Sequence, residues 1–498
     1  MGLVVLMVFL FAAGMRLVPL KLSGGNGGVD QWTWKTIIDA MRKGSRLPVS
    51  LDKFLLDEKQ WYPPLFQWLM ARLPARIYDE YASLVAVVLD LVRAALVILT
   101  VWLFSGSVVV VLIAGLVYAI TPLLITYNMQ LNPRGLGALF LDIILLGALN
   151  FFYLEGGGVW LVVLALFSGL VLITHKMTTQ LLWFMVFSGA IFSFSPSYLI
   201  LIPASVIVAL MLSGGYYRFV ALAHWDIVRF WFKNWRWSGS HPVLESPIYG
   251  EAGYESSSKF YRLGWFAWWR RLSFVVGFNP WVPIVIGVSA FALAEGIKLL
   301  PVTVFFLSWT GLILLFSVVT TLVPHLRCFG QGYLYGYNGA FPAAALMGLL
   351  WPELGEKWYY LVALVLGVVA SGLGLWAFFK QVMKSRTMRV DVNLSLAIDR
   401  LKALPDGVVM CLPQHWHDAV AYRAQKKVLF GGHGYGFRLL QPIFPRFLEP
   451  VSGLIATYKI RYLLTYEGYC NQKFMDDLPS STVEAFGDYR LYIFSYSE

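Results

Sequence analysis

One acidic residue, Asp30, follows a glycine-rich segment at residues 23–29 (SGGNGGV), which comes directly after an apolar N-terminal stretch. Glycine lets the backbone bend and approach a ligand closely. A carboxylate at such a place could accept a proton from a reacting group. It could also cap the helix expected to begin at Gln31, because its oxygen can satisfy free N–H groups of the first turn. Residue types alone leave both interpretations of Asp30 open.

Two cationic turns lie at the ends of apolar segments. Arg134 stands in an Asn-Pro-Arg-Gly turn that opens one such segment, and a planar guanidinium can hold a phosphate with two hydrogen bonds. His175 and Lys176 end another, in the sequence ITHKMTT. The first turn could therefore bind phosphate. The alternative for both turns is that they anchor the chain at the lipid–water boundary, where cationic side chains reach toward the headgroups.

The composition places most of the chain in a bilayer. Of its 498 residues 58% are hydrophobic, 16% aromatic and only 13% charged, unlike any ordinary soluble domain. Three cysteines without a CxxC spacing predict neither a disulfide framework nor a zinc site. The net charge of +11 suggests anionic partners, which for a membrane protein are lipid headgroups or a phosphate-bearing substrate. No nucleic-acid motif is present.

Residues 1–383 are expected to form a polytopic, mainly α transmembrane domain. A span needs about 20 mostly apolar residues. By that measure we expect eleven spans: Leu3–Leu20, Ser83–Phe104, Ser107–Tyr127, Gly135–Leu154, Val159–Thr174, Thr179–Phe194, Ser197–Ser213, Trp281–Lys298, Val302–Pro324, Tyr335–Trp351 and Trp358–Phe379. No internal repeat is evident, which argues against the duplicated halves common in transporters.

Two loops interrupt the apolar pattern. Residues 21–82 contain an amphipathic stretch typical of an interfacial helix, and then a Trp-Tyr-Pro-Pro turn that presents Tyr62. Residues 214–280 are rich in Trp, Tyr and Arg. The flanks of this second loop predict interfacial amphipathic helices, and its polar middle predicts a mobile loop.

Residues 384–498 follow a basic hinge and have the composition of a small soluble α/β domain. About 115 residues are enough for an independent core. Alternating apolar runs predict strands at Val408–Leu412, Tyr462–Thr465, Thr482–Phe486 and Tyr489–Ser495, and helices at Asn393–Leu404, His417–Ala424 and Pro450–Tyr458.

The layout resembles the GT-C glycosyltransferases, which are integral membrane enzymes that use lipid-phosphate-linked sugars and include protein mannosyltransferases and the aminoarabinose transferases of lipid A. The likeness rests on an Asp just past the first span, a long amphipathic first loop and a YPPLF element before the second span. It implies a GT-C-like membrane domain, with residues 214–280 over the active site and the C-terminal domain on the same side.

The resemblance also implies a reaction. A sugar would move from a polyprenyl-phosphate-linked donor to a lipid, glycan or protein acceptor, with inversion at the anomeric carbon. Such a transfer needs a base for the acceptor's proton and cations for the departing phosphate, which is already a weak base and needs no paired acid. Asp30 would be the base, and Arg134 and Lys176 would hold the phosphate.

Further substrate contacts are expected on the same side of the membrane. Asp57 and Glu58 precede the Pro-Pro turn, where related enzymes carry a second acidic group. They could bind the acceptor or a divalent metal ion, the one cofactor that we consider, or they could be solvated loop charges. The other candidates are Tyr62, His175, His241, Tyr249, His325 and Arg327.

Two rules disagree about topology. The side that holds both loops and the C-terminal domain carries nearly all the Lys and Arg, which the positive-inside rule would assign to the cytoplasm. The family resemblance instead implies a plasma (inner) membrane protein whose active site faces the periplasm or exterior. We follow the resemblance and interpret the positive charge as substrate-binding.

A transporter or flippase of a lipid-linked or anionic substrate is the alternative function. It is suggested by Asp90 and Arg93, which lie three residues apart within the second span. Charges inside a membrane are costly and often functional. Residues three apart share one helical face, so mutual pairing is the simpler account. Arg16, near the end of the first span, would reach toward the headgroups or face the carrier phosphate.

Overall fold

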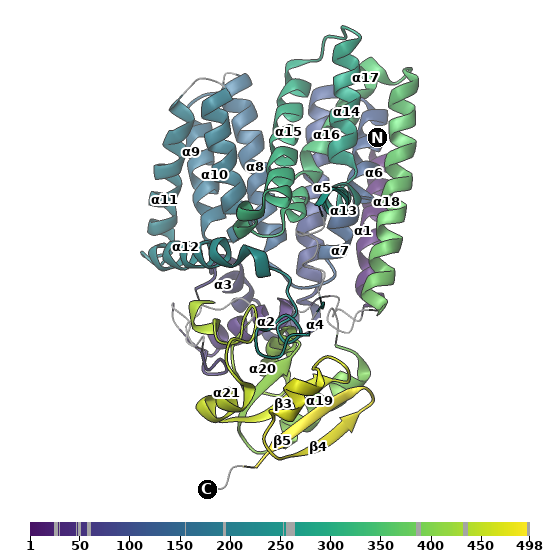
Figure 1. Cartoon of the computed structure of the whole chain (residues 1–498). Helices are drawn as coiled ribbons and strands as arrows, with labels where there is room; N and C mark the ends of the chain where they lie inside the picture. The colour runs from purple at the N-terminus through teal and green to yellow at the C-terminus, as the bar shows by residue number, and fades with distance from the viewer. Residues whose placement is uncertain are drawn as a thin grey trace. The chain divides into compact units, whose positions relative to one another are not determined.

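The computed structural model describes most of the chain, as two compact units. The described residues are 1–23, 28, 30–45, 47, 51–56, 61–154, 156–192, 196–251, 253–254, 264–384, 390–431 and 437–495. The first unit, here called the membrane unit, comprises residues 1–25, 75–218 and 269–383. The second, here called the C-terminal unit, comprises residues 26–74, 219–268 and 384–498. Figure 1 shows the elements of both.

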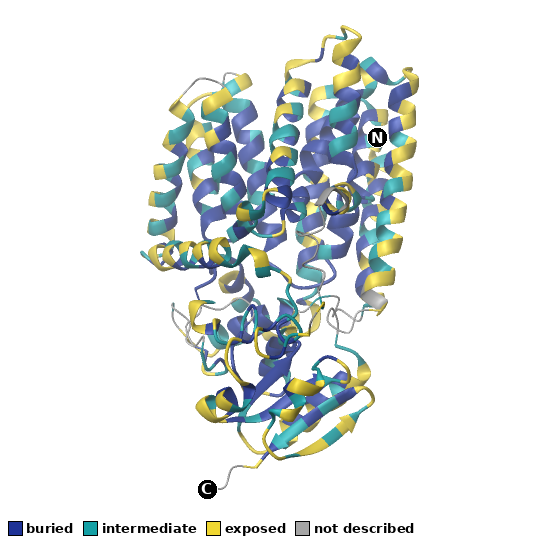
Figure 2. Cartoon of the chain, viewed as in Figure 1, coloured by how far each residue is buried: buried dark blue, intermediate teal, exposed yellow. Residues whose placement is uncertain are grey.

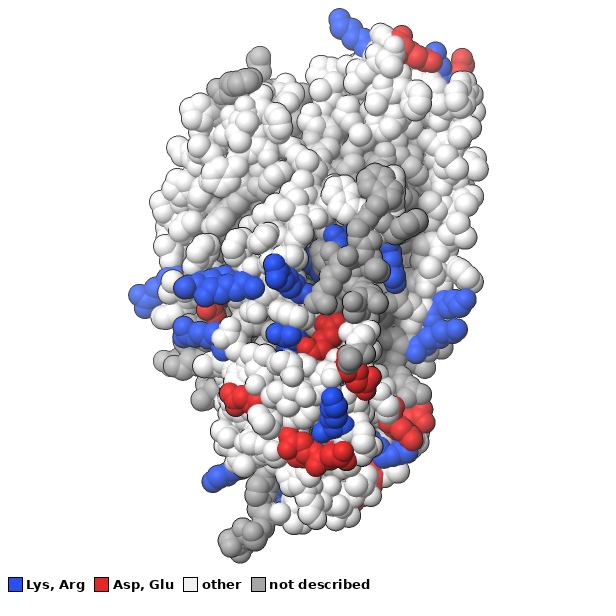
Figure 3. Space-filling model, viewed as in Figure 1, with Lys and Arg blue, Asp and Glu red and all other residues white. Residues whose placement is uncertain are grey.

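Long apolar helices dominate the membrane unit. Among the described residues, five helices are long and apolar enough to cross a membrane: α1 (Gly2–Leu22), α5 (Leu84–Ser105), α8 (Arg134–Tyr153), α15 (Pro301–Leu322) and α18 (Trp358–Lys384). A sixth span is possible if α13 (Gly264–Phe278) and α14 (Trp281–Ala294), bent by 92° relative to each other, are taken as one. The upper part of the face shown in Figure 3 carries almost no charged groups below its top edge, as a lipid-facing surface requires.

Shorter helices complete the membrane unit. They are α4 (Ala75–Tyr81), α6 (Val108–Ala119), α7 (Pro122–Tyr127), α9 (Val159–Leu172), α10 (Lys176–Phe192), α11 (Leu201–Leu212), α16 (Ala340–Leu349) and α17 (Trp351–Leu354), with 3-10 turns η1 (Pro196–Ile200), η4 (Pro324–Phe329) and η5 (Gly332–Tyr337). They fall mostly in segments predicted to span, but the count of eleven spans is not confirmed, because so many are too short to cross a bilayer.

Helix α16 is shorter than the span predicted for its segment. Tyr335–Trp351 was expected to cross the membrane, but the helix covers only ten residues and every one of them is buried. It packs against α5, α6, α14 and α15. A Cβ atom at Gly348 would lie 2.8 Å from the Val110 carbonyl oxygen, so glycine allows α6 to come close. A helix that is apolar on all sides belongs in the core of a bundle, as Figure 2 shows.

A five-stranded sheet forms the core of the C-terminal unit. Its strands are β1 (Val408–Leu412), β2 (Lys427–Val428), β3 (Ile460–Tyr466), β4 (Ser481–Phe486) and β5 (Tyr489–Phe494). Their order is β2-β1-β3-β5-β4; β1 is parallel to β2 and β3, and β5 is antiparallel to β3 and β4. Leu464 of β3, for example, faces Leu491 of β5. The four predicted strands are confirmed, whereas β2 is too short to give a sequence signal.

Helices flank this sheet. α19 (Val392–Ala403), α20 (His417–Arg423) and α21 (Val451–Tyr458) lie where they were predicted. The unit also contains α2 (Asp30–Arg42), α3 (Leu65–Ala71), most of α12 (Tyr217–Asn234), α22 (Gln472–Asp476) and the 3-10 turns η2 (Trp235–Trp237), η6 (Gln414–Trp416) and η7 (Phe437–Leu440). Both amphipathic stretches, at α2 and α12, are therefore helical as expected.

The first loop extends the edge of the sheet. Phe54 pairs with Val428 of β2 in a parallel bridge. The Leu55 N–H donates to the Val428 carbonyl at 2.9 Å, and the Val428 N–H donates to the Lys53 carbonyl at 2.8 Å. Backbone pairing on an open strand edge satisfies groups that would otherwise need water. The segment directly before Asp57 is thus held by the C-terminal sheet.

The middle of the second loop is also built into the C-terminal unit. Val243 and Tyr249 are buried in the same hydrophobic core as Phe447 and Phe474, and the Ser246 hydroxyl donates to the Phe447 carbonyl at 2.6 Å. The expectation of a mobile loop therefore does not hold for residues 241–250. Residues 255–263 lie outside the described part of the chain.

Candidate functional site

Arg134 begins helix α8 at a turn that is fixed by hydrogen bonds. The Asn132 amide donates to the Tyr127 carbonyl at 2.7 Å, and its oxygen accepts from the Arg134 N–H at 3.0 Å. These bonds satisfy backbone groups at the helix start. They also set the direction in which the Arg134 side chain leaves the helix.

The guanidinium of Arg134 lies among aromatic rings and a methionine. It is 4.9 Å from the ring centroid of Tyr127 and 5.9 Å from that of Tyr337. Its terminal nitrogens are 3.9 Å from the sulfur of Met177. No described carboxylate of the membrane unit forms an ion pair with it. Arg134 is largely buried, so its uncompensated charge favours an anion.

His175 packs against α8 at Gly137 and caps helix α10. Its Nδ1 accepts from the Thr178 N–H at 3.3 Å and lies 2.9 Å from the Thr178 hydroxyl. Glycine at position 137 of α8 permits this packing, since a Cβ there would lie 2.8 Å from the Cβ of His175. Lys176 is the first residue of α10 and is partly exposed. The phosphate candidates Arg134, His175 and Lys176 therefore gather at adjacent ends of α8 and α10.

The connection between α15 and α16 adds polar groups near Arg134. The Tyr333 hydroxyl is hydrogen-bonded to Tyr127 and lies within electrostatic range of Arg134 and Arg327. Arg327 donates to the Gln331 side chain at 3.2 Å. His325 begins the same connection and is exposed. Arg327 thus joins the cationic group of the membrane unit. Sequence reasoning missed the tyrosines, although the GYLYGY repeat at residues 332–337 was a visible signal.

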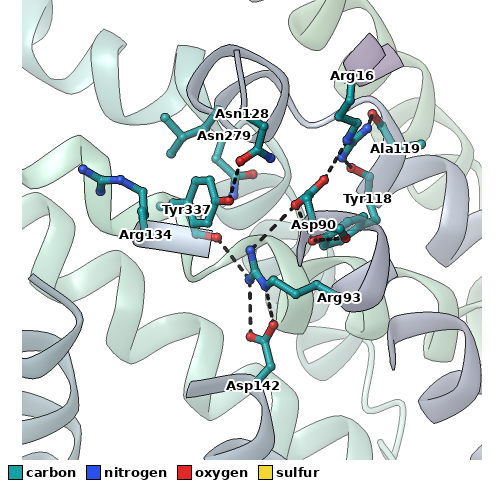
Figure 4. A network of polar contacts seen from close by, with 12 residues as sticks. Arg16, Asp90, Arg93, Tyr118, Ala119, Asn128, Arg134, Asp142, Asn279 and Tyr337 are labelled. Atoms are coloured by element: carbon teal, nitrogen blue, oxygen red, sulfur yellow. Dashed lines mark hydrogen bonds and ion pairs between the residues drawn. The ribbon is translucent and has the colours of Figure 1, made fainter. Parts of the chain in front are cut away.

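A second group of charges in the membrane unit neutralises itself (Figure 4). Arg93 of α5 pairs with Asp142 of α8 at 2.5 Å and lies 4.0 Å from Asp90. Asp90 accepts from Arg16 of α1 at 2.7 Å and from the Tyr118 hydroxyl at 2.8 Å. The expectation that Arg16 reaches toward the headgroups is wrong, because it is buried against Asp90. Pairing of Asp90 with Arg93 is present, but each has a shorter contact elsewhere.

Asp30 lies in the C-terminal unit, as the first residue of α2, and is partly exposed. Helix α2 packs on α20, with the rings of Trp32 and Tyr422 5.5 Å apart. His415 stands just before α20 and retains solvent-accessible surface. Protein atoms crowded around its ring lower the pKa of His415, and the nearby charge of Asp30 opposes that shift. The expected base thus has an imidazole as a neighbour, which the sequence did not suggest.

Tyr62 and the two acidic residues before it were expected to contact substrate. Tyr62 is 3% exposed, and its ring lies 4.4 Å from that of Trp34 and 5.9 Å from that of Trp61. It therefore packs within the C-terminal unit, against α2. Asp57 and Glu58 lie outside the described residues.

His241 and Tyr249 are held by residues of the C-terminal core. The centroid of the His241 ring lies 4.3 Å from that of the Tyr469 ring, and the His241 Nδ1 accepts from the Leu244 N–H at 3.1 Å. Burial lowers the pKa of His241 to about 4, so the ring is neutral at physiological pH. The Tyr249 hydroxyl donates to Asp477 and accepts from the Val451 N–H. These contacts give both side chains a structural role in the unit.

The described residues contain no group of three or more His, Cys, Asp or Glu that could hold a metal ion. His417, for example, has a structural role and does not offer a free nitrogen to a metal ion. Its Nε2 accepts from the Cys411 N–H and its Nδ1 donates to the Gln414 carbonyl, both at 2.9 Å. Burial lowers its pKa to about 3. Both ring nitrogens are therefore occupied in the hydrogen bonding that joins β1 to α20.

No family model and no curated protein sequence matches this chain. Among solved structures it is similar to the oligosaccharyltransferase of Archaeoglobus fulgidus, solved with zinc and sulfate, with a TM-score of 0.56 and 12% identity over 93% of this chain and 68% of that chain.

Two structures of ArnT from Cupriavidus metallidurans, one bound to undecaprenyl phosphate and one in the apo state, have TM-scores of 0.47 and 0.46. Each is 11% identical and covers 98% of this chain and 97% of that chain. The similarity to the oligosaccharyltransferase shows that the chain has a GT-C-type fold, as the layout of its sequence implied.

Proposed function

We propose that this protein is a membrane glycosyltransferase that moves a sugar from a polyprenyl-phosphate-linked donor to a lipid, glycan or protein acceptor. The observation that carries the proposal is Arg134: a buried guanidinium at the end of α8, held by Tyr127 and Tyr337 and without a carboxylate partner among the described residues of its unit. A desolvated cation of this kind binds a phosphate strongly. The GT-C fold supports the assignment to this class of enzyme.

In the proposed mechanism Asp30 removes the proton from an acceptor hydroxyl, whose oxygen attacks the anomeric carbon with inversion. The bond between that carbon and the phosphate oxygen breaks, and the electron pair leaves with the polyprenyl phosphate. Arg134 and Lys176 stabilise this leaving group. Because the solved oligosaccharyltransferase contains zinc, a divalent ion at Asp57 and Glu58 is part of the proposal, but no step depends on it.

We place the protein in the plasma (inner) membrane with its active site on the extracytoplasmic side. His241, Tyr249, His325 and Arg327 are the further residues proposed to act on that side. Of these, Arg327 has the strongest support, because it shares Tyr333 with Arg134. Tyr62, His241 and Tyr249 are packed against their own unit, so any effect on substrate would come through the shape of the surface that they hold.

The alternative function is a transporter or flippase of a lipid-linked or anionic substrate. The charges in the second span, which suggested it, no longer support it. The charges in the second span are matched by Arg16 and Asp142 within the protein. A closed set of two cations and two anions needs no transported ion to explain it.

The test is transfer of radiolabel by the purified protein from a polyprenyl-phosphate sugar. Asp30→Asn removes the basic oxygen while keeping the shape, so we expect transfer to fall at least 100-fold, within the range that acid–base groups contribute, with lipid binding unchanged. Asp39→Asn, on the same helix, is the matched control and should retain activity. Full activity of Asp30→Asn would refute the mechanism, and release of intact donor across a bilayer without transfer would favour the transporter.

A further inference from the structure

Tyr337 lies between two arginines, of which Arg93 is paired with a carboxylate and Arg134 is not. Its side chain is fully buried, and the centroid of its ring is 5.1 Å from the guanidinium carbon of Arg93 and 5.9 Å from that of Arg134. Its hydroxyl donates to the Asn128 side chain at 2.9 Å. Figure 4 shows the ring between the two cations, with the Arg134 side chain pointing away from the ion network. Both contacts are within the range of cation–π attraction.

Of the two arginines, Arg93 is the one held by carboxylates. It makes two hydrogen bonds to Asp142, at 2.5 and 3.3 Å, and donates to the Tyr337 carbonyl at 3.5 Å. Asp90 stands 4.0 Å away on the other side. A bidentate guanidinium–carboxylate pair has one preferred geometry. Arg93 therefore holds both the backbone and the ring of Tyr337 in place.

Arg134 has no such pair of its own. Its guanidinium contacts only rings and the sulfur of Met177 among the described residues of the membrane unit. A side chain with four rotatable bonds loses conformational entropy when it binds a ligand. Neighbouring side chains that already hold it in the bound conformation reduce that loss. The direction of the cation thus depends on the position of Tyr337.

A second connection runs along helix α8. Asp142, which binds Arg93, lies on the same helix as Arg134, eight residues further along, so the Arg93–Asp142 pair also fixes α8 against α5. The buried network is therefore connected to Arg134 in two ways, through the Tyr337 ring and through helix α8. The network itself is neutral, whereas Arg134 has no ion pair with a described carboxylate of its unit.

We propose that Tyr337 and Arg93 are positioning residues for Arg134: Arg93 fixes Tyr337, and the Tyr337 ring fixes the guanidinium that binds the donor phosphate. This inference rests on the proposed function, since it takes Arg134 to be the phosphate-binding group. Neither Tyr337 nor Arg93 touches the phosphate in this arrangement. Their effect should therefore disappear when Arg134 is removed.

The test is a double-mutant cycle on the detergent-purified full chain, with binding of farnesyl phosphate measured by calorimetry. Tyr337→Leu removes the ring and should weaken binding about tenfold, within the range for a desolvated cation–π contact. Arg134→Gln should weaken it more. In the Arg134→Gln background, Tyr337→Leu should cause no further loss, because coupled residues are not additive.

Controls separate positioning from general destabilisation. Tyr360 is fully buried, and its hydroxyl donates to the Met347 carbonyl at 2.6 Å, so Tyr360→Leu should lower the thermal midpoint and leave affinity unchanged. Tyr337→Phe keeps the ring and should bind within about twofold of the unaltered protein, since it loses one hydrogen bond but not the cation–π contact. Arg93→Lys keeps the charge but not the two-bond geometry, and should weaken binding only when Arg134 is present.

The outcomes are distinguishable. Unchanged affinity in Tyr337→Leu, or an equal loss with and without Arg134, would overturn the inference while leaving the proposed function intact. If Tyr337→Leu does not fold, the same comparison with Arg93→Lys decides the question. If Arg134→Gln binds farnesyl phosphate as tightly as the unaltered protein, the phosphate role of Arg134 fails, and this inference fails with it.

Discussion

Two arginines of the membrane unit show how environment decides the role of one residue type. Arg93 is buried against two carboxylates, which neutralise its charge inside the protein. Arg134 is buried against rings and a thioether. Substitution of Arg93 would leave a buried carboxylate unpaired, which costs stability. Substitution of Arg134 should mainly affect binding, since no ion pair is lost.

At the same scale, His417 predicts a pH dependence of stability. Its pKa is about 3 in the folded protein against an ordinary 6.5, so the unfolded chain takes up a proton that the folded chain does not. Stability should therefore fall as the pH drops below 6.5, by about 1.4 kcal/mol per unit, or about 2 kcal/mol at pH 5.

His417→Gln can accept and donate hydrogen bonds without titrating, and should reduce this slope, with the part due to the lowered pKa of His241 remaining. The measurement is the thermal midpoint from pH 8 to pH 5. At pH 8 the imidazole is neutral in both states, so that point serves as the reference. An unaltered slope in the variant would show that other groups cause the acid sensitivity.

At the scale of elements, α16 shows why the apolar pattern does not by itself give the number of spans. The pattern reports burial in an apolar environment, and a buried helix and a lipid-facing helix satisfy it equally. Helix α16 is buried on every side, whereas α18 exposes Val365, Leu366 and Trp376. Only the packing distinguishes the two cases.

Gly348 offers a test of that packing. Gly348→Ala would place a Cβ 2.8 Å from the Val110 carbonyl oxygen and 2.9 Å from the Ala114 Cβ, so we expect a loss of about 1–3 kcal/mol from overpacking. Gly372→Ala in α18 is the matched control, because a Cβ there meets no atom within 4 Å. It should be neutral or slightly stabilising. Equal thermal midpoints for the two variants would contradict the close approach of α16 and α6.

At the scale of the whole molecule, the C-terminal unit is assembled from three separate stretches of chain, residues 26–74, 219–268 and 384–498. The first contributes the edge segment that pairs with β2, and the second contributes Val243 and Tyr249 to the core. The helix that begins with Asp30 packs on α20. The last 115 or so residues are thus the scaffold on which both loops are folded.

Removal of residues 385–498 should therefore unfold the loops. We expect trypsin to cleave after Lys53 at least tenfold faster in the truncated protein, because its backbone carbonyl no longer pairs with Val428. Mass spectrometry of the fragments would measure this. A chain lacking only residues 496–498 is the control. Equal cleavage rates in all three proteins would show that the loops fold without the sheet.

The sequence by itself determined the features that depend on neighbouring residues. Runs of apolar side chains located the helices of the membrane unit, alternation located four strands, and the Asn-Pro-Arg turn located Arg134. The layout of these local features also predicted the GT-C fold, which the oligosaccharyltransferase comparison confirms.

The tertiary structure decided the contacts between residues far apart in the chain. The pairing of Arg93 with Asp142, the position of Tyr337 between two arginines and the addition of Phe54 to the sheet all join distant segments. Local composition carries no information about which of several charges or rings will meet. That choice depends on how the helices pack, because a buried charge is stable only with a partner at the right distance and angle.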